Sequence, residues 1–429
     1  MPRLPGFPTD CTITFDGDPV PARAGESVAS ALLAAGRPLL SRSAKYHRPR
    51  GPFCLSGSCG SCLVRVDGAP SVRACATPCR EGLAVETQNA FPSAEHDLLG
   101  GIDALYARGL DAHHLMTWNA LANRAAVALS RRLAGVGRLP EAPPPSAAPA
   151  PPAEERFDAL VVGAGPAGLG AAEALSRAGR RILLAEAEPL PGGRLRARLG
   201  PAGDPDLAWA DQVAASVRSA GGEVAVGATV LALWIDRGEP LAGIRTGGPA
   251  PVRLVRAGRI ILCPGGHPQP PAIPGGDRPG VLAARGLAAA LREHGVLPGR
   301  RIAVLGDGPE AEALAGRLRV AGAEVLAAPA AARLLGRSRV RGLVLPDGRR
   351  IACEAVAVAA PPAPATDLAR HLGAEVVLDP ILAAFAVRVS ASGATSVPGL
   401  LAAGEATGPM GAAGARESGR RAGEEAARG

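Results

Sequence analysis

The sequence predicts an α/β protein built from several domains, and three observations carry this prediction. Six of the eight cysteines fall within the first 79 residues, in a segment of alternating strands and turns. A stretch in which seven of thirteen residues (140–152) are proline comes later. Beyond it, a strand, a glycine-rich turn, a helix and a second strand occur twice, which is the pattern of nucleotide-binding domains with parallel sheets.

The composition of the 429-residue chain supports a folded protein and excludes several classes. Hydrophobic residues make up 47% and charged residues 20%, so the chain can bury large cores. The net charge of +8 comes from arginines spread among apolar stretches, so we expect no nucleic-acid partner. Apolar runs are too short for a transmembrane segment, and prolines break the start where a secretory signal would be apolar. We therefore expect a cytoplasmic protein with reduced thiols.

The N-terminal segment is predicted to be a small β-rich domain. A strand from Cys11, a turn at 16–18 and a second short strand precede a helix that begins near Ser27 and ends at Gly36. A later stretch alternates around Asp67-Gly68, a pair typical of tight hairpins.

Four cysteines have the plant-type spacing for a [2Fe–2S] cluster: Cys54, Cys59, Cys62 and Cys75. Gly57 and Gly60 would let the loop turn and bring amide groups toward the sulfurs. The hairpin can then carry Cys75 back beside Cys62. The alternatives are a zinc site or reduced structural thiols, although structural zinc favours paired Cys-x2–4-Cys knuckles and only one such pair is present. The sequence thus favours a β-grasp, ferredoxin-like [2Fe–2S] domain.

The first glycine-rich turn contains Gly163, Gly165, Pro166, Ala167 and Gly168. It follows an apolar strand, opens a helix and precedes a second strand that ends at Glu186. In this fingerprint the glycines allow a tight turn, close approach of a pyrophosphate and close helix packing, and the helix N-terminus faces the phosphate charge. Glu186 stands where a carboxylate would accept hydrogen bonds from ribose hydroxyls. A coincidental glycine turn is the alternative.

The second turn contains Gly306 and Gly308, with Ala311 at the third position. The strand that follows ends without an acid for a ribose diol, and Arg333 lies outside a clear ribose-phosphate pattern. Two interpretations remain open: an NAD(P) site, or a retained fold whose nucleotide site is empty.

Two further motifs resemble those of the disulfide-reductase-like flavoproteins, which have two dinucleotide-binding domains. One contains Gly193 and Arg194, and the other contains Gly404 and Glu405. The resemblance implies FAD at the first turn, with the late motif closing the flavin site. Glu405 stands where that class usually has Asp.

Longer motifs resemble a narrower family. RSAKYHRPRG (42–51) precedes the cysteine loop, and DRPGV (277–281) follows the first turn. These motifs and their order are similar to the alpha subunits of heteromeric sarcosine oxidase and its relatives, the opine oxidase, hydrogen cyanide synthase and proline or hydroxyproline dehydrogenase complexes. Sarcosine oxidase alpha subunits continue into a folate-binding region, whereas this chain stops at Gly429, so folate chemistry is not expected.

The resemblance implies an iron–sulfur flavoprotein subunit of an amine or amino-acid dehydrogenase or oxidase complex. A beta subunit similar to D-amino-acid oxidase would oxidise a sarcosine-, opine- or proline-type substrate, and this chain would relay the electrons through FAD and the cluster. No catalytic residue can be identified in this chain, which agrees with a substrate site on the beta subunit. The alternatives are an NAD(P)H-dependent reductase that passes electrons through FAD to the cluster, and an assembly subunit whose cofactors only stabilise it.

The basic block consists of Arg42, Lys45, His47, Arg48 and Arg50. It could bind RNA, but we expect it to pack against the flavoprotein body or to neutralise nucleotide phosphate. The predicted segments are a ferredoxin-like domain (1–92), a helical segment (93–139), a proline-rich linker (140–156) and an FAD-dependent module (157–429) with a second nucleotide-binding-like subdomain at about 275–365.

Overall fold

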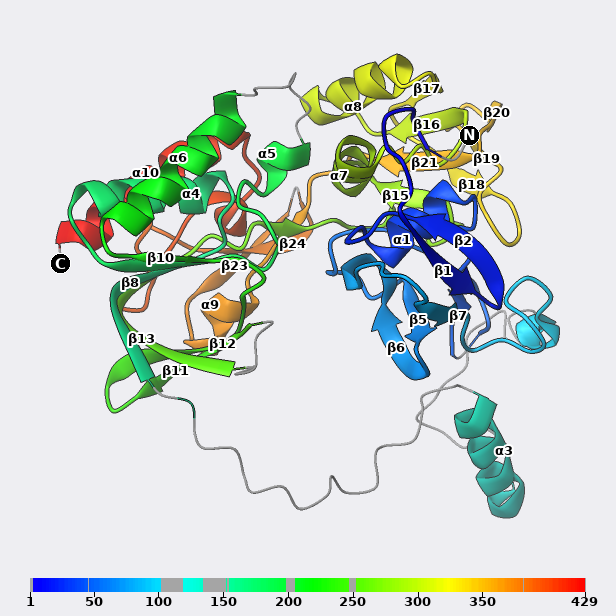
Figure 1. Cartoon of the computed structure of the whole chain (residues 1–429), viewed down its shortest axis with the longest axis horizontal. Helices are drawn as coiled ribbons and strands as arrows, with labels where there is room; N and C mark the ends of the chain where they lie inside the picture. The colour runs from blue at the N-terminus through cyan, green and yellow to red at the C-terminus, as the bar shows by residue number, and fades with distance from the viewer. Residues whose placement is uncertain are drawn as a thin grey trace. The chain divides into compact units, whose positions relative to one another are not determined.

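The computed structural model describes residues 3–44, 46–101, 119–133, 152, 154–197, 205–246, 252–380 and 382–428. Lys45 and most of the proline-rich segment lie outside these residues. The chain forms two compact units, one of Met1–Pro144 with Gln269–Ala360 and one of Pro145–Pro268 with Pro361–Gly429 (Figure 1). The boundaries drawn from the sequence stay predictions. Among the described residues, no helix is both long and apolar enough to cross a membrane.

The first unit begins with the predicted β-grasp domain. Its five-stranded sheet has the order β2-β1-β7-β5-β6, in which β1 pairs with β7 in parallel and both predicted hairpins are present. The Ser27 side chain caps helix α1 by accepting a hydrogen bond from the amide of Ser30, and every residue of α1 is buried. The elements are β1 Cys11–Phe15, β2 Asp18–Ala22, α1 Val28–Ala34, β3 Ser41–Arg42, β4 Pro49–Arg50, β5 Leu63–Val66, β6 Ala69–Arg73, η1 Ala74–Ala76, β7 Ala84–Glu86, η2 Leu98–Gly101 and α3 Ala120–Leu133.

The rest of the first unit is the second subdomain, residues 269–360. Its four-stranded parallel sheet has the order β15-β21-β16-β17, and a separate antiparallel sheet contains β18, β19 and β20. The strand, turn, helix and strand predicted around Gly306 correspond to β16, α8 and β17. The elements are β15 Val281–Ala283, α7 Ala284–His294, β16 Arg301–Leu305, α8 Pro309–Val320, β17 Glu324–Ala328, β18 Arg333–Leu335, β19 Gly342–Val344, β20 Arg350–Ala352 and β21 Ala355–Val358.

The second unit contains a seven-stranded sheet with the order β10-β9-β8-β13-β12-β11, and β25 also pairs with β13. Strands β8, β9, β10, β13 and β25 run parallel, whereas β11, β12 and β13 form an antiparallel meander. The elements are β8 Glu154–Val162, α4 Pro166–Arg177, β9 Ile182–Ala185, α5 Arg194–Ala197, α6 Pro205–Ser219, β10 Glu223–Ala225, β11 Thr229–Asp236, β12 Glu239–Arg245, β13 Val252–Leu262, β14 Gly266–His267, β22 Ala363–Pro364, α9 Asp367–His371, β23 Val376–Asp379, β24 Ala384–Val387, β25 Leu400–Ala402, η3 Gly404–Thr407 and α10 Ala412–Arg428.

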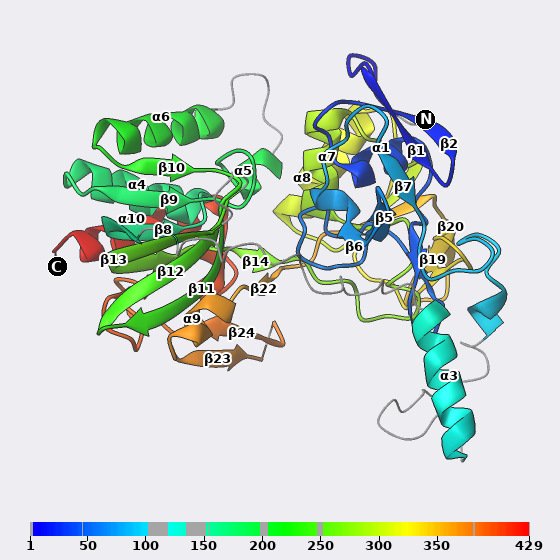
Figure 2. The same cartoon turned by 60° about the horizontal axis from the view of Figure 1, so that its bottom comes forward.

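The central strands of this sheet are covered on both faces. Successive residues of a strand point to opposite sides, so one strand contributes to two cores. In β8, Ala159 and Val161 pack under α4, α6 and α10, whereas Leu160 and Val162 belong to the core on the other face. Figure 2 shows these three helices on one side of the sheet, with α9, β23 and β24 on the other. The first glycine turn lies at the end of β8 and is therefore held between two packed cores.

Candidate functional site

The cysteine loop turns where the sequence predicts. Gly57 and Gly60 have φ values of +74° and +64°, a region that favours glycine. The amide of Gly57 donates a hydrogen bond to the sulfur of Cys75 at 3.2 Å, and the amides of Ser56 and Ser61 donate to the sulfurs of Cys54 and Cys59 at 3.4 Å. Such N–H···S bonds stabilise thiolates and tune a bound cluster. The two serine amides escaped the sequence analysis, because the pattern shows side chains and not the direction of the backbone.

The four predicted cluster ligands lie close together, and each thiol interacts with at least one of the others. Cys54 interacts with Cys59 and Cys75, and Cys62 interacts with Cys75. These hydrogen bonds lower the pKa of Cys54 and Cys62 and raise the pKa of Cys59 and Cys75. Four neighbouring thiols in and beside one loop are the donor set that a [2Fe–2S] cluster requires.

The two edges of the cysteine loop differ in exposure. Cys54 and Cys62 are each 1% exposed, whereas Cys59 lies at the surface and Cys75 is half-buried. Cys54 and Phe53 belong to the hydrophobic core of the second subdomain, alongside residues of β15, β16 and β21. A cluster held by this loop would therefore have one edge toward solvent and one edge against the second subdomain.

The other cysteines are isolated buried thiols. Burial raises the pKa of Cys79 and of Cys263 to about 12, and it also raises the pKa of Cys11. Cys11 and Cys79 lie in the β-grasp core. Cys263 lies beside the first glycine turn, where Gly168 packs against it. A thiol with a raised pKa is a poor nucleophile, which agrees with a packing role.

The described residues of the basic block make intramolecular contacts. Arg50 forms an ion pair with Asp277 at 2.6 Å, and thus joins the two motifs that the sequence analysis singled out. Arg42 donates to the carbonyl of Ala94, and Arg48 lies over the ring of Tyr46. The ring of His47 contacts Asp97 at 2.9 Å, and both side chains are buried. The block therefore holds the surrounding loops together and joins them to the second subdomain.

The first glycine turn has the shape required for close approach of a pyrophosphate. Gly163 has φ +92°, and a Cβ there would overlap the carbonyl oxygen of Cys263. A Cβ on Gly168 would overlap the carbonyl oxygen of Gly163, so this glycine is needed for helix packing. At Gly165, by contrast, φ is −74° and no heavy atom lies within 4 Å of the Cβ position. The fold does not require glycine at 165, and the open space there is what a phosphate group would use.

Glu186 lies beside this turn and is held in a fixed position. One carboxylate oxygen accepts from the amide of Ala164 at 2.7 Å, and the other accepts from the amide of Glu188 at 2.9 Å. The side chain is 8% exposed, and burial raises its pKa. A fixed carboxylate next to the turn can accept hydrogen bonds from the hydroxyls of a ribose.

The two late motifs converge on the same turn. A Cβ on Gly193 would lie 2.9 Å from the Cα of Gly165, and one on Gly404 would lie 2.7 Å from the Cβ of Ala167. Ala167 follows Pro166, the first residue of α4. Three stretches far apart in the sequence thus surround the start of α4. The open space at Gly165, the fixed carboxylate and these glycines fit FAD.

An ion pair connects the two late motifs. Arg194 donates to a carboxylate oxygen of Glu405 at 2.7 Å and to the carbonyl of Met410 at 2.5 Å. Both charged side chains are largely buried, so the pair positions each partner. The sequence analysis named both residues but not their contact, since 211 residues separate them.

The second turn differs from the first in its backbone and lacks a counterpart of Glu186, since Gly308 has φ +84° where Gly165 has φ −74°. Gly306 and Gly308 have φ values of +116° and +84°, and no heavy atom lies within 4 Å of the Cβ position at 308. The strand after the turn ends at Ala328, so no carboxylate stands where Glu186 stands in the first turn. In the first turn of α8, Glu310 pairs with Arg285 at 2.7 Å. A carboxylate at this helix start disfavours a phosphate.

A β-grasp domain with four neighbouring cysteines and a two-part module with a flavin-type turn define an iron–sulfur flavoprotein. Residues 9–90 match the family of 2Fe-2S iron-sulfur cluster binding domains, and residues 157–341 match the pyridine nucleotide-disulphide oxidoreductases. The chain is 33% identical over 440 aligned residues to the sarcosine oxidase subunit alpha of Rhizobium meliloti, covering 91% of this chain and 44% of that protein. The chain belongs to the family of sarcosine oxidase alpha subunits and their relatives, and it spans less than half the length of that relative.

Two other known proteins are similar to this chain, one to its N-terminal part and one to nearly its whole length. Over 87 residues the chain is 45% identical to the hydrogen cyanide synthase subunit HcnA of Pseudomonas aeruginosa, which is 20% of this chain but 83% of HcnA. The crystal structure of L-proline dehydrogenase from P. horikoshii has the same fold, with a TM-score of 0.74, 18% identity, and coverage of 99% of this chain and 75% of that one.

Proposed function

We propose that this chain is the iron–sulfur flavoprotein subunit of a cytoplasmic amine or amino-acid dehydrogenase or oxidase complex. The observation that supports this most strongly is the presence, in one chain, of a cysteine loop and a flavin-type nucleotide turn. When bound, FAD would accept electrons two at a time and a [2Fe–2S] cluster would pass them on singly. The chain's own residues would bind and orient these groups.

Each cofactor has its own set of residues in this proposal. Cys54, Cys59, Cys62 and Cys75 would hold the cluster. Gly165 and Pro166 would face the FAD pyrophosphate at the start of α4, and Glu186 would bind a ribose. The pair of Arg194 and Glu405 would close the flavin site, with its charges held in place by burial. The second turn would hold no flavin, since it lacks an equivalent of Glu186.

Oxidation of the amine would take place on a partner, a flavoprotein similar to D-amino-acid oxidase. Substrates of the sarcosine, opine or proline type carry a carboxylate beside the amine, and a site for them needs a positioned cation and a group that accepts a proton. Around the first turn, the largely buried cation Arg194 is already bound to Glu405 and to the carbonyl of Met410, so we assign these groups to the nucleotide site and not to an amine.

The test is to mix the purified, FAD-loaded chain anaerobically with sarcosine, L-proline or an opine. We expect no reduction of its flavin until a separately purified D-amino-acid-oxidase-like subunit is added. Dithionite should reduce the isolated chain, which controls for damaged flavin. Rapid reduction of the isolated chain by any of these amines would overturn the proposed division between subunits.

An NAD(P)H-dependent reductase is the second candidate, and the open space at Gly308 favours it. Stopped-flow mixing with NADH or NADPH distinguishes the two. Bleaching of the flavin within seconds would support the reductase, and an unchanged spectrum would support the relay subunit.

A further inference from the structure

Helix α7 of the second subdomain is contacted at both ends by the iron–sulfur domain. At its start, the amide of Ala283 donates to the carbonyl of Phe53 at 2.8 Å. A Cβ on Gly286, within the first turn of the helix, would overlap the carbonyl oxygen of Cys54. The cysteine loop therefore rests directly on the first turn of α7, at a point where only glycine leaves room.

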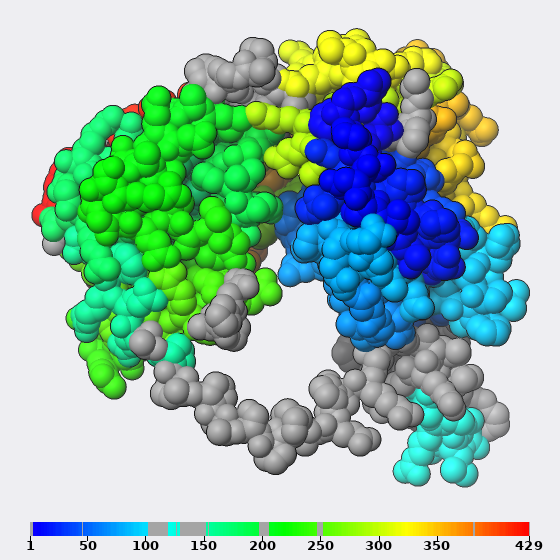
Figure 3. Space-filling view, viewed as in Figure 1, coloured from blue at the N-terminus to red at the C-terminus, as the bar shows by residue number. Residues whose placement is uncertain are grey.

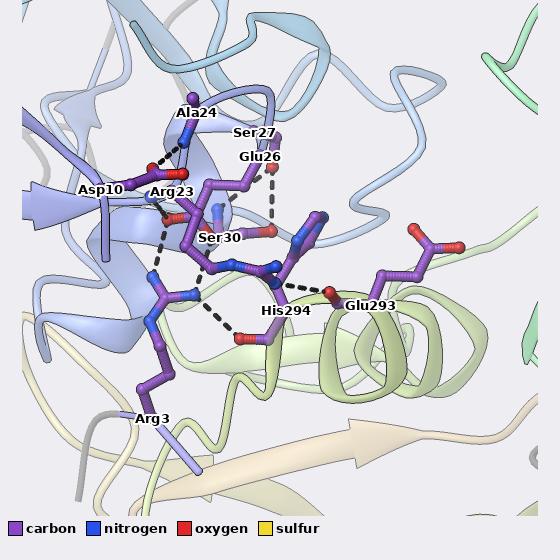
Figure 4. Close-up of polar contacts among 9 residues, drawn as sticks. All are labelled: Arg3, Asp10, Arg23, Ala24, Glu26, Ser27, Ser30, Glu293 and His294. Carbon is purple, nitrogen blue, oxygen red and sulfur yellow. Dashed lines mark hydrogen bonds and ion pairs between the residues drawn. The ribbon is translucent and has the colours of Figure 1, made fainter. Parts of the chain in front are cut away.

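The far end of α7 is held by two arginines of the β-grasp domain (Figure 4). Arg3 donates to the carbonyl of His294 at 2.8 Å, and Arg23 donates to the carbonyl of Glu293 at 2.9 Å. Carbonyl groups at a helix C-terminus lack partners within the helix and carry partial negative charge, which guanidinium groups satisfy. Since two cations contact two successive carbonyls, the end of α7 has a specific position relative to the iron–sulfur domain.

Glu26 holds the first of these arginines in place. Its carboxylate binds the guanidinium of Arg3 through both oxygens, at 2.7 and 2.9 Å, and accepts from the amide of Arg23 at 2.7 Å. Glu26 is 1% exposed. A buried carboxylate requires its partner, because removal of either charge leaves the other buried and unpaired.

Further contacts extend this interface between the β-grasp domain and the second subdomain. The amide of Leu4 donates to the carbonyl of Gly295 at 2.9 Å, and the ring of Phe7 covers that glycine. At the other end, Gly51 packs on Pro279 next to the ion pair of Arg50 described above. In the space-filling view the blue surface of the β-grasp domain adjoins the yellow-green and yellow surface of the second subdomain (Figure 3). The interface thus combines a buried apolar centre, Phe53 and Cys54, with charged groups around it.

We propose that this face of the second subdomain, formed by residues 277–283, helix α7 and Gly295, is a specific docking site for a β-grasp iron–sulfur domain. The site holds the domain through the contacts described and does not depend on the covalent connection through residues 140–152. Its natural occupant is the chain's own N-terminal domain. HcnA, which matches this domain over 83% of its own length, shows that such a domain exists as a separate polypeptide.

The test is to cut the connection in the folded protein. A recognition site for a sequence-specific protease is introduced within residues 140–152 of the full chain, and the product of cleavage is analysed by size-exclusion chromatography at physiological salt. We expect both fragments to elute together in a 1:1 ratio with iron and FAD retained. Separation of the wild-type fragments would overturn the proposal.

A matched pair of substitutions tests the site itself. Gly286→Ala places a Cβ on the carbonyl of Cys54, whereas Gly316→Ala, within helix α8, meets no heavy atom within 4 Å. Both substitutions replace a helical glycine by alanine and should favour the helix to the same extent. We expect the cleaved Gly286→Ala protein to dissociate at least ~10-fold more readily than wild type, and the Gly316→Ala protein to behave as wild type. Equal behaviour of the two would contradict the assignment.

A second variant tests the same interface in case the Gly286→Ala protein does not fold. Arg3→Ala removes the contact with the end of α7 and leaves Glu26 unpaired. Its control is Arg37→Ala, which removes an exposed ion pair with Asp18 inside the β-grasp domain. We expect only Arg3→Ala to release the N-terminal fragment after cleavage, with FAD content unchanged. Retention of that fragment by Arg3→Ala would show that the arginine contacts do not hold the domain.

Discussion

The two glycine-rich turns of this protein both join a strand to a helix, but they differ in backbone conformation and in surroundings. The first has a fixed carboxylate, Glu186, beside it and two further glycine motifs around it. The second lacks the carboxylate and has Glu310 paired with Arg285 at its helix start. The helix that precedes the second turn in the chain, α7, instead carries the iron–sulfur domain. One repeated fold thus serves two purposes: the first copy offers polar groups to a nucleotide, and the second copy offers a surface to another domain.

The largest expected effect comes from adding the same side chain to both turns. At neither Gly165 nor Gly308 does a Cβ meet a heavy atom. Gly308 has φ +84° and ψ −178°, a region essentially limited to glycine, so the flavin is counted per folded chain in both variants. Gly165→Asn should reduce the FAD content of the purified protein to less than about a tenth of wild type, because the side chain would occupy the space of the pyrophosphate. Gly308→Asn should leave the FAD content unchanged. Flavin release by heat and absorbance quantify both, and the opposite result would assign the flavin to the second turn.

Removal of a cluster ligand should cause loss of the cluster from the first unit without loss of FAD from the second unit. Cys59→Ser replaces the exposed cysteine of the loop and should remove most iron and acid-labile sulfide, about two of each per chain in the wild type. FAD should remain, since all of its proposed contacts lie in the second unit. Colorimetric iron and sulfide assays and flavin absorbance measure this. Loss of FAD together with iron would show that the two sites depend on each other, and zinc in place of iron in wild type would refute the cluster.

A smaller effect concerns pH and Glu186. Burial raises the pKa of this carboxyl, so in the flavin-free protein the cost of burying its charge disappears as the pH falls through that pKa. Only the ionised form accepts hydrogen bonds through both oxygens from a ribose and the backbone. The affinity of the flavin-free protein for FAD should therefore fall as the pH is lowered through the raised pKa. Glu186→Gln should bind FAD roughly 10-fold more weakly at neutral pH and lose this pH dependence. Fluorescence titration measures both, and an unchanged pH profile in the variant would exclude the role of Glu186.

Local features were predictable from the sequence, whereas contacts between distant segments were not. Ser27 marks the start of α1 and Asp67-Gly68 marks a hairpin, because capping and tight turns depend on neighbouring residues. The contact of Arg3 with the carbonyl of His294 spans 291 residues and involves a backbone atom, which no sequence motif encodes. No motif encodes the contact between the cysteine loop and Gly286 either, because it depends on the absence of a side chain at 286. The motifs around Arg50 and Asp277 were recognisable, but their contact became evident only in the structure.

The central claim is that this chain carries a flavin and an iron–sulfur cluster that exchange electrons. An anaerobic titration of the purified protein with dithionite, followed by visible absorbance and electron paramagnetic resonance, tests it most directly. We predict an uptake of about three electrons per chain, two by the flavin and one by the cluster, with the paramagnetic signal of a reduced [2Fe–2S] centre. An uptake of two electrons without any iron signal would contradict the claim.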